Sequence, residues 1–346
     1  LGAMRRPECR DGREVRNSHA FFVSITSNDL LTLNSGVQEA QNLNNMKRIY
    51  TILGKHLKPL VLALAIVSPH LMKAANVEIN ETNFPDENFR LWVSNYCDSD
   101  GDGKLSKDEI HNVTYGGFND GSFSSLKGIE YFTYITDLYV GGNPDLTELD
   151  LSSLTRLETL SAGNTGLNSL NITGCTRLKS INLSKCYIKE LDMTGFERLE
   201  YFEYNESEDL KTLNFTNCPK LNNIHCRGNA ELSSFTVAGC PALTFIDIEY
   251  HNLKKLDVGG LPKLVTLYCY SDYGELEDIN ASDCPKLTSV NINYEYIKSL
   301  NLSNTGFESL YIGNANELTT LNVTGCAKLD HLEVNQCGEL ASLDLT

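Results

Sequence analysis

A repeat of about 21 residues runs from Ile135 to the end of the sequence. Each unit contains two L-x-x-L-x-L segments, called here the first and second segments; one unit begins its first segment at Leu157 and its second at Leu167. Further units, 20–23 residues apart, begin at Leu178, Leu199, Leu221, Leu243, Leu264, Leu287, Phe307 and Leu329. Because a fixed period of this length is typical of stacked repeats, the sequence predicts a solenoid.

The spacing inside each segment indicates a short β-strand. Positions 4 and 6 of a segment lie on one face of a strand, so their apolar side chains point inward together. One coil cannot bury this edge, whereas stacked coils share a core. No long helical pattern separates the segments, and the sequence predicts a β-rich leucine-rich repeat solenoid of about ten coils over residues 135–346. The expected core ladder is Leu149, Leu170, Leu191, Leu213, Leu256, Leu300 and Leu321.

Cysteines recur at position 9 of the second segment. They are Cys175, Cys218, Cys240, Cys284 and Cys326, and other repeats carry Leu154, Phe196 or Leu261 there. Exchange with large apolar residues indicates inward sites where sulfur acts as a small hydrophobe. Disulfides are the alternative for an exported protein; the periodic placement favours free buried thiols. Zinc is disfavoured, because the sequence has no C-x-x-C pair.

Residues 98–109 fit the EF-hand calcium loop. Carboxylates stand at loop positions 1, 3 and 5, Gly103 at position 6 and a glutamate at position 12. The expected ligands are Asp98, Asp100, Asp102, the Lys104 carbonyl, Ser106 and Glu109. Helices are predicted before the loop, from about Asp86, and after it, from Lys107 to about Val113. Sensor loops come in pairs, so this single loop predicts a structural Ca²⁺ site in a small helical cap over residues 76–134.

The N-terminal 75 residues differ in character from the rest of the chain. Residues 46–75 combine a basic start, an apolar run (60–67) and small residues at 74 and 75, as in a secretory signal peptide. A buried or amphipathic helix is the alternative, and the apolar run is too short to span a bilayer. Residues 1–45 are expected to be an unstructured upstream extension, and the mature protein to begin near Asn76.

The charge of the chain is unevenly placed. Residues 1–75 carry ten Lys/Arg and five Asp/Glu, a net charge of +5, whereas residues 76–346 carry 19 and 40, a net charge of −21. An acidic body of this kind repels phosphate backbones and anionic lipid. Nucleic-acid binding is therefore not expected.

The motifs together resemble bacterial internalin-like surface proteins with cysteine-containing repeats. The resemblance rests on units such as residues 167–175, on the stretch 84–90, on the loop 98–109 and on residues 126–132, which look like the calcium-loop cap of exported bacterial arrays. It implies a secreted or cell-surface binding protein. The sequence has no cell-wall sorting signal and stops at Leu345-Thr346 in mid-repeat, so we expect the array to be truncated at its C-terminus.

The two segments differ at position 5. The second segment carries short polar residues there, which suggests scaffold, whereas the first segment mixes aromatic and acidic residues. Exposed aromatics among carboxylates are typical of recognition surfaces. The predicted partner-binding residues are Tyr201, Phe245, Tyr268, Tyr270 and Tyr311. The alternative is that these rings cover backbone as cross-strand neighbours.

Two functions compete. The first is a non-catalytic, monomeric adhesion or recognition protein that binds an extracellular protein or glycan. The second is the substrate-binding arm of a larger exported enzyme whose catalytic domain lies beyond Thr346; a purely structural stalk is a weaker third. No Ser/His/Asp or Cys/His group stands out from the repeat, and the histidines His111, His225, His251 and His331 are expected to be surface or strand residues. The chain itself is therefore not expected to be an enzyme.

Overall fold

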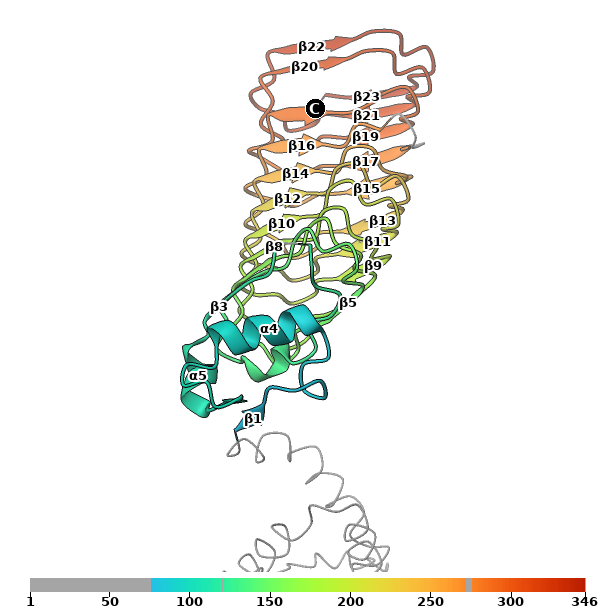
Figure 1. The fold of residues 1–346 in the computed structure, drawn as a ribbon. Helices are drawn as coiled ribbons and strands as arrows, with labels where there is room; N and C mark the ends of the chain where they lie inside the picture. The colour runs from blue at the N-terminus through green and yellow to red at the C-terminus, as the bar shows by residue number, and fades with distance from the viewer. Residues whose placement is uncertain (1–75, 120, 272–275, 346) are drawn as a thin grey trace, which may run out of the picture. The chain divides into compact units, whose positions relative to one another are not determined.

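The computed structural model describes residues 76–119, 121–271 and 276–345. A small helical cap is followed by a stack of coils, each with one strand on either side (Figure 1). This is the predicted leucine-rich repeat solenoid. The predicted extension (1–45) and signal peptide (46–75) lie outside the described residues. Within the described ranges, no helix has the length and apolarity that crossing a bilayer requires.

The first segments form a continuous parallel sheet of nine strands, called here the first-segment sheet. In chain order its strands are β3 (Tyr115–Gly117), β4 (Asp137–Tyr139), β6 (Thr159–Ser161), β8 (Ser180–Asn182), β10 (Tyr201–Glu203), β12 (Asn223–His225), β14 (Phe245–Asp247), β16 (Thr266–Tyr268) and β18 (Ser289–Asn291). The register holds equivalent positions together, for example Phe202 opposite Ile224 and Ile224 opposite Ile246. The last two first segments, β20 (Ser309–Ile312) and β22 (His331–Val334), pair as a separate sheet.

The second segments are paired in shorter groups on the other side of the stack. One group holds β5 (Glu148–Asp150) and β7 (Ser169–Asn171); the next holds β9 (Glu190–Asp192), β11 (Thr212–Asn214) and β13 (Ser234–Thr236). The third holds β15 (Lys255–Asp257), β17 (Asp278–Asn280), β19 (Ser299–Asn301), β21 (Thr320–Asn322) and β23 (Ser342–Asp344). The two sides of the solenoid thus differ in continuity, a difference that the shared period does not reveal.

The core between the two sides is the predicted ladder. Leu149, Leu191, Leu213, Leu256, Leu300 and Leu321 are buried, and Leu170 is half-buried against the same cluster. The cysteines at position 9 of the second segment reach back to the preceding coil: the thiol of Cys218 donates to the Met193 carbonyl at 3.0 Å, and that of Cys240 to the Phe215 carbonyl at 3.0 Å. All ten described cysteines are free thiols, eight of them buried and two half-buried.

A second ladder, made mostly of polar side chains, occupies position 9 of the first segment. It was not predicted from the sequence. Six successive coils carry Asn143, Thr165, Cys186, Ser207, Asn229 and His251 there. These side chains bond backbone groups between coils: Asn229 Oδ1 accepts from the Ser207 N–H at 3.2 Å, and its Nδ2 donates to the Tyr204 carbonyl at 2.8 Å. Buried backbone groups at the coil corners thereby find partners. His251, expected to be a surface or strand residue, is 0% exposed and lies between β14 and β15, so that prediction was wrong.

The described part of the cap consists of two helices, the short strands β1, β2 and β3, and a 3₁₀ turn. Helix α4 (Glu87–Tyr96) and helix α5 (Lys107–Asn112) flank the predicted calcium loop, as the sequence indicated, and η1 spans Ile129–Tyr131. Strand β1 (Val77–Glu78) pairs antiparallel with β2 (Lys104–Leu105). An aromatic cluster packs α4 against the residue that follows β3: the ring of Phe118 lies 4.7 Å from that of Trp92 and 5.4 Å from that of Phe89. The Phe118 N–H donates to the Tyr139 carbonyl of the first coil at 2.7 Å. Tyr96, the last residue of α4, is exposed.

Candidate functional site

The loop between α4 and α5 is folded around its aspartates. Asp98 Oδ2 accepts from the Gly103 N–H at 2.9 Å, and Asp98 Oδ1 accepts from the Gly101 N–H at 2.9 Å. Gly101 and Gly103 both have positive φ, which glycine adopts at low cost and which turns the loop back on itself. As a result, one carboxylate oxygen from each of Asp98, Asp100 and Asp102 lies within 4.8 Å of the others. Three hard oxygen donors converging in this way suit a calcium ion.

Glu109, expected as the twelfth ligand of the loop, does not belong to this group of oxygens. Its carboxylate instead accepts from the backbone N–H groups of Ser106 (2.8 Å) and Ser99 (2.7 Å). The Ser106 side chain accepts in turn from the Glu109 N–H, which completes a capping box at the start of α5. The hydrogen bond from the Ser106 N–H, together with those from Ser99, lowers the pKa of Glu109 to about 2. The three aspartates therefore fit the cation, while Glu109 ties both ends of the loop together.

The loop also has a strand partner. In β2 the residues Lys104 and Leu105 pair with Glu78 and Val77 of β1, and the Ile79 N–H donates to the Gly103 carbonyl at 3.0 Å. β1 thus pairs with the C-terminal part of the loop and fixes its position within the cap.

Aromatic rings form a row across the outer face of the first-segment sheet. The ring centroids of Tyr201 and His225 are 5.4 Å apart, those of His225 and Phe245 4.9 Å, and those of Phe245 and Tyr268 5.7 Å. The four side chains come from β10, β12, β14 and β16, four strands that pair in succession, and all are half-buried. In the parallel register the rings alternate between two positions: Tyr201 and Phe245 are the first residues of their strands, and His225 and Tyr268 are the last, so neighbouring rings meet diagonally. We call these four residues the aromatic row.

The predicted partner-binding residues are only partly brought together. Tyr201, Phe245 and Tyr268 belong to the aromatic row. Tyr270 lies just past β16, its ring 6.4 Å from that of Tyr250. Tyr311 is 59% exposed on β20, which lies outside the first-segment sheet. The row also includes His225, a residue that its position 5 in the first segment could have identified.

Two acidic side chains beside the row are covered rather than exposed. Asp247 is 5% exposed and Glu249 8% exposed. The Arg227 guanidinium contacts both, at 2.8 Å from Asp247 Oδ2 and 3.1 Å from Glu249 Oε2, and its hydrogen bond to Asp247 raises the pKa of Arg227. Asn291 donates to Glu249 Oε1 at 2.5 Å. This network fixes the charged side chains across several coils and so holds the surface around the rings rigid.

A second network lies at the other end of the row. Glu203 accepts from the Tyr201 hydroxyl at 3.0 Å, from Asn182 at 2.9 Å and from Asn205 at 3.0 Å. Burial, together with the bond to Glu203, raises the pKa of Tyr201 to about 12. The phenol is thus a neutral donor at physiological pH, held in one orientation.

Comparisons with known proteins support the fold. No protein-family model and no curated protein matches the sequence. The functional domain of InlJ from Listeria monocytogenes, described as including a cysteine ladder, has a TM-score of 0.54 at 21% identity; the match covers 79% of this chain and 64% of that chain. Two further structures from the same organism are an internalin, inlF (TM-score 0.39, 13% identity, 80% of this chain and 99% of that chain), and internalin C2, inlC2 (0.37, 20%, 67% and 96%).

At these identities the likeness concerns the fold alone, and the fold assignment rests on the InlJ comparison. This chain spans about two thirds of the InlJ domain, 64% of its length. In this chain free thiols recur at position 9 of the second segment. The described residues therefore form a leucine-rich repeat solenoid similar in fold to the InlJ domain.

Proposed function

We propose that this chain is a non-catalytic recognition protein that acts outside the cell and binds a protein or glycan partner through the outer face of its first-segment sheet. The observation that carries the proposal is the aromatic row of Tyr201, His225, Phe245 and Tyr268. Rigid rings with a polar rim supply binding energy at little cost in side-chain entropy. Arg227, held in place by the buried carboxylates Asp247 and Glu249, adds a partly exposed cationic group of fixed orientation at the rim of the rings.

The calcium site belongs to the same proposal. Asp98, Asp100 and Asp102 would hold a Ca²⁺ ion that neutralises their mutual repulsion and stiffens the cap. Extracellular calcium, at millimolar levels, fills even weak sites of this kind. We therefore assign the ion a structural role: it stabilises the loop that joins α4 to α5, and the binding face lies elsewhere.

The test compares two variants of the full chain on a glycan array and in pull-downs with candidate extracellular proteins. The face variant replaces Tyr201, Phe245, Tyr268, Tyr270 and Tyr311 with alanine. The matched control replaces polar residues on the opposite side, Asn301 and Asn322, with alanine. We expect at least about a tenfold loss of affinity in the face variant alone, since each interface aromatic contributes of the order of 1 kcal/mol or more. Equal binding by wild type and face variant would place the partner on another surface.

A further inference from the structure

The cap closes one side of the first coil and leaves the other side open. On the first-segment side, β3 of the cap pairs with β4, with Gly116 opposite Leu138. On the second-segment side, β5 pairs with β7, and no strand in the described ranges lies along its other edge. β5 is therefore an open edge of a parallel sheet. Such edges are templates for an added strand.

The backbone of β5 presents its hydrogen-bonding groups at this edge. In β7 the backbone N–H of Ser169 donates to the Thr147 carbonyl of the preceding coil at 3.3 Å. In each strand, therefore, the backbone N–H and C=O groups of every second residue face the preceding coil. The residues of β5 in register with Ser169 and Asn171 are Glu148 and Asp150. Among the described residues, no partner binds the N–H or C=O of either one on the cap side.

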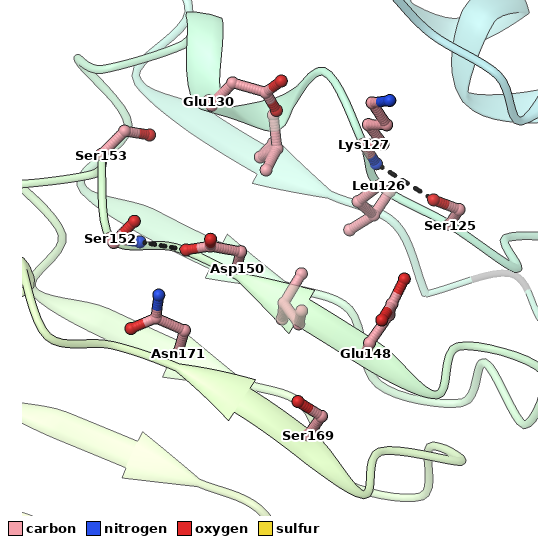
Figure 2. A pocket seen from close by; sticks show the side chains of 12 residues that line it. Ser125, Leu126, Lys127, Glu130, Glu148, Asp150, Ser152, Ser153, Ser169 and Asn171 are labelled. Atoms are coloured by element: carbon pink, nitrogen blue, oxygen red, sulfur yellow. Dashed lines mark hydrogen bonds between the residues drawn. The ribbon is translucent and has the colours of Figure 1, made fainter. Parts of the chain in front are cut away.

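A cavity of about 500 Å³ lies along this edge, between β5 and residues 125–130 of the cap (Figure 2). Its size falls within the range of ligand sites. The buried side chains of Leu126, Ile129 and Leu149 contribute the apolar part of its lining. The edge is therefore bordered by space rather than by packed cap residues.

The charged residues of the cavity are mostly acidic. Glu130, Glu148 and Asp150 lie around it together with a single cation, Lys127. Glu148 and Asp150 are two residues apart on β5, so their side chains leave the strand on the same face. An added strand with basic residues two apart would match this spacing.

We propose that the β5 edge and its cavity form a docking site for an extended, basic peptide segment of a partner protein. The segment adds as a strand beside β5, bonding to the backbone of Glu148 and Asp150, while its Lys or Arg side chains meet Glu130, Glu148 and Asp150. Main-chain bonds supply affinity and alternate side chains supply specificity in this mode of recognition. The site is separate from the aromatic row and goes beyond the function proposed for it.

The first test uses fluorescein-labelled hexapeptides of alternating valine and lysine, or valine and glutamate, with the full chain. Fluorescence anisotropy should show the lysine peptide binding about tenfold more tightly, as two or three partly exposed ion pairs would give, and added salt should reduce the difference. Hydrogen exchange at the amides of Glu148 and Asp150 should slow on binding. Equal affinity for both peptides, or unchanged exchange at these amides, would overturn the proposal.

The second test separates backbone pairing from charge. Glu148→Pro removes the N–H at the open edge, where edge strands tolerate proline, whereas the control Glu148→Ala keeps the N–H and removes the carboxylate. We expect about a threefold loss for alanine and about tenfold or more for proline, with circular dichroism unchanged. Equal losses for both variants would mean that β5 is not extended by a strand. The alanine variant of the first-segment face should bind the lysine peptide as wild type does; a loss there would instead place the peptide on that face.

Discussion

His251 gives the sharpest test of the coil interior. Its Nδ1 accepts from the Leu253 N–H at 3.0 Å, so the proton sits on Nε2, which lies 3.2 Å from the Cys269 carbonyl. Burial lowers the pKa of His251 to about 4, from the ordinary value of 6.5. The unfolded chain therefore takes up a proton below pH 6.5, and the folded chain only near pH 4. Stability from the neutral imidazole is complete above pH 6.5 and is lost as the pH falls toward 4.

The magnitude follows from the two pKa values. Between pH 7 and pH 4.5 the neutral, buried ring should lose about 2–3 kcal/mol of unfolding free energy. His251→Asn removes the titration but keeps a residue that the same ladder position carries naturally at Asn143 and Asn229. The difference in unfolding free energy between wild type and His251→Asn should shift by this amount over that pH range.

The assay is urea unfolding followed by far-ultraviolet circular dichroism, which reports on the strands of the coils. Tryptophan fluorescence would report on the cap instead, because the single tryptophan, Trp92, lies in α4. Carboxylates titrate in both proteins, so their contribution cancels in the difference. His331→Asn, at an exposed histidine, is the control and should show a small shift. A difference for His251→Asn that stays constant within about 0.5 kcal/mol from pH 7 to 4.5 would refute the reasoning, since the ring would then protonate in the folded state at its ordinary pKa.

Three further outcomes are expected. A calcium chelator should lower the melting temperature by several degrees without removing the circular-dichroism signal of the β-strands, because the ion acts on the cap. Asp98→Asn should abolish this effect of the chelator. An unchanged melting temperature of the wild-type protein in chelator would mean that the loop holds no ion. Gly128→Ala should destabilise the cap by about 2 kcal/mol or more in thermal melts. The φ of Gly128 is 108°, and an added Cβ would lie 2.7 Å from the Asn83 carbonyl oxygen. A melting temperature equal to that of wild type would contradict this geometry. Thiol titration of unfolded, unreduced protein should find at least ten reactive groups, and a count lower by two or more would mean disulfides.

Much of the fold was predictable because each coil repeats the same spacing of apolar residues. The inward leucines, such as Leu213, and the thiols at position 9 of the second segment are defined by spacing alone. The convergence of Asp98, Asp100 and Asp102 could be predicted as well, because the three aspartates follow one another closely in the sequence. The role of Glu109 could not be predicted in the same way. A glutamate at position 12 of such a loop is also the third residue of the following helix, so the same sequence pattern fits a metal ligand and a member of a capping box.

Other features depended on which residues stack in three dimensions. The strand pattern predicts exposed side chains at Asp247 and Glu249. Both are buried in the structure, because Arg227 from the preceding coil covers them. Tyr311 occupies the same repeat position as Tyr268 but lies in a different sheet, because pairing of the first segments is interrupted after β18. A period of 20–23 residues does not specify where such interruptions fall.

The sequence by itself determined that the chain forms coils, which side chains enter the core and where three aspartates converge, because those properties repeat or are local. Only the tertiary structure decided that one side of the stack is a continuous sheet with aligned rings and that the other begins with the unpaired edge of β5. The physical reason is that strand pairing joins residues about one coil apart and depends on how the cap docks on the first coil, where β3 reaches β4 and no cap strand reaches β5.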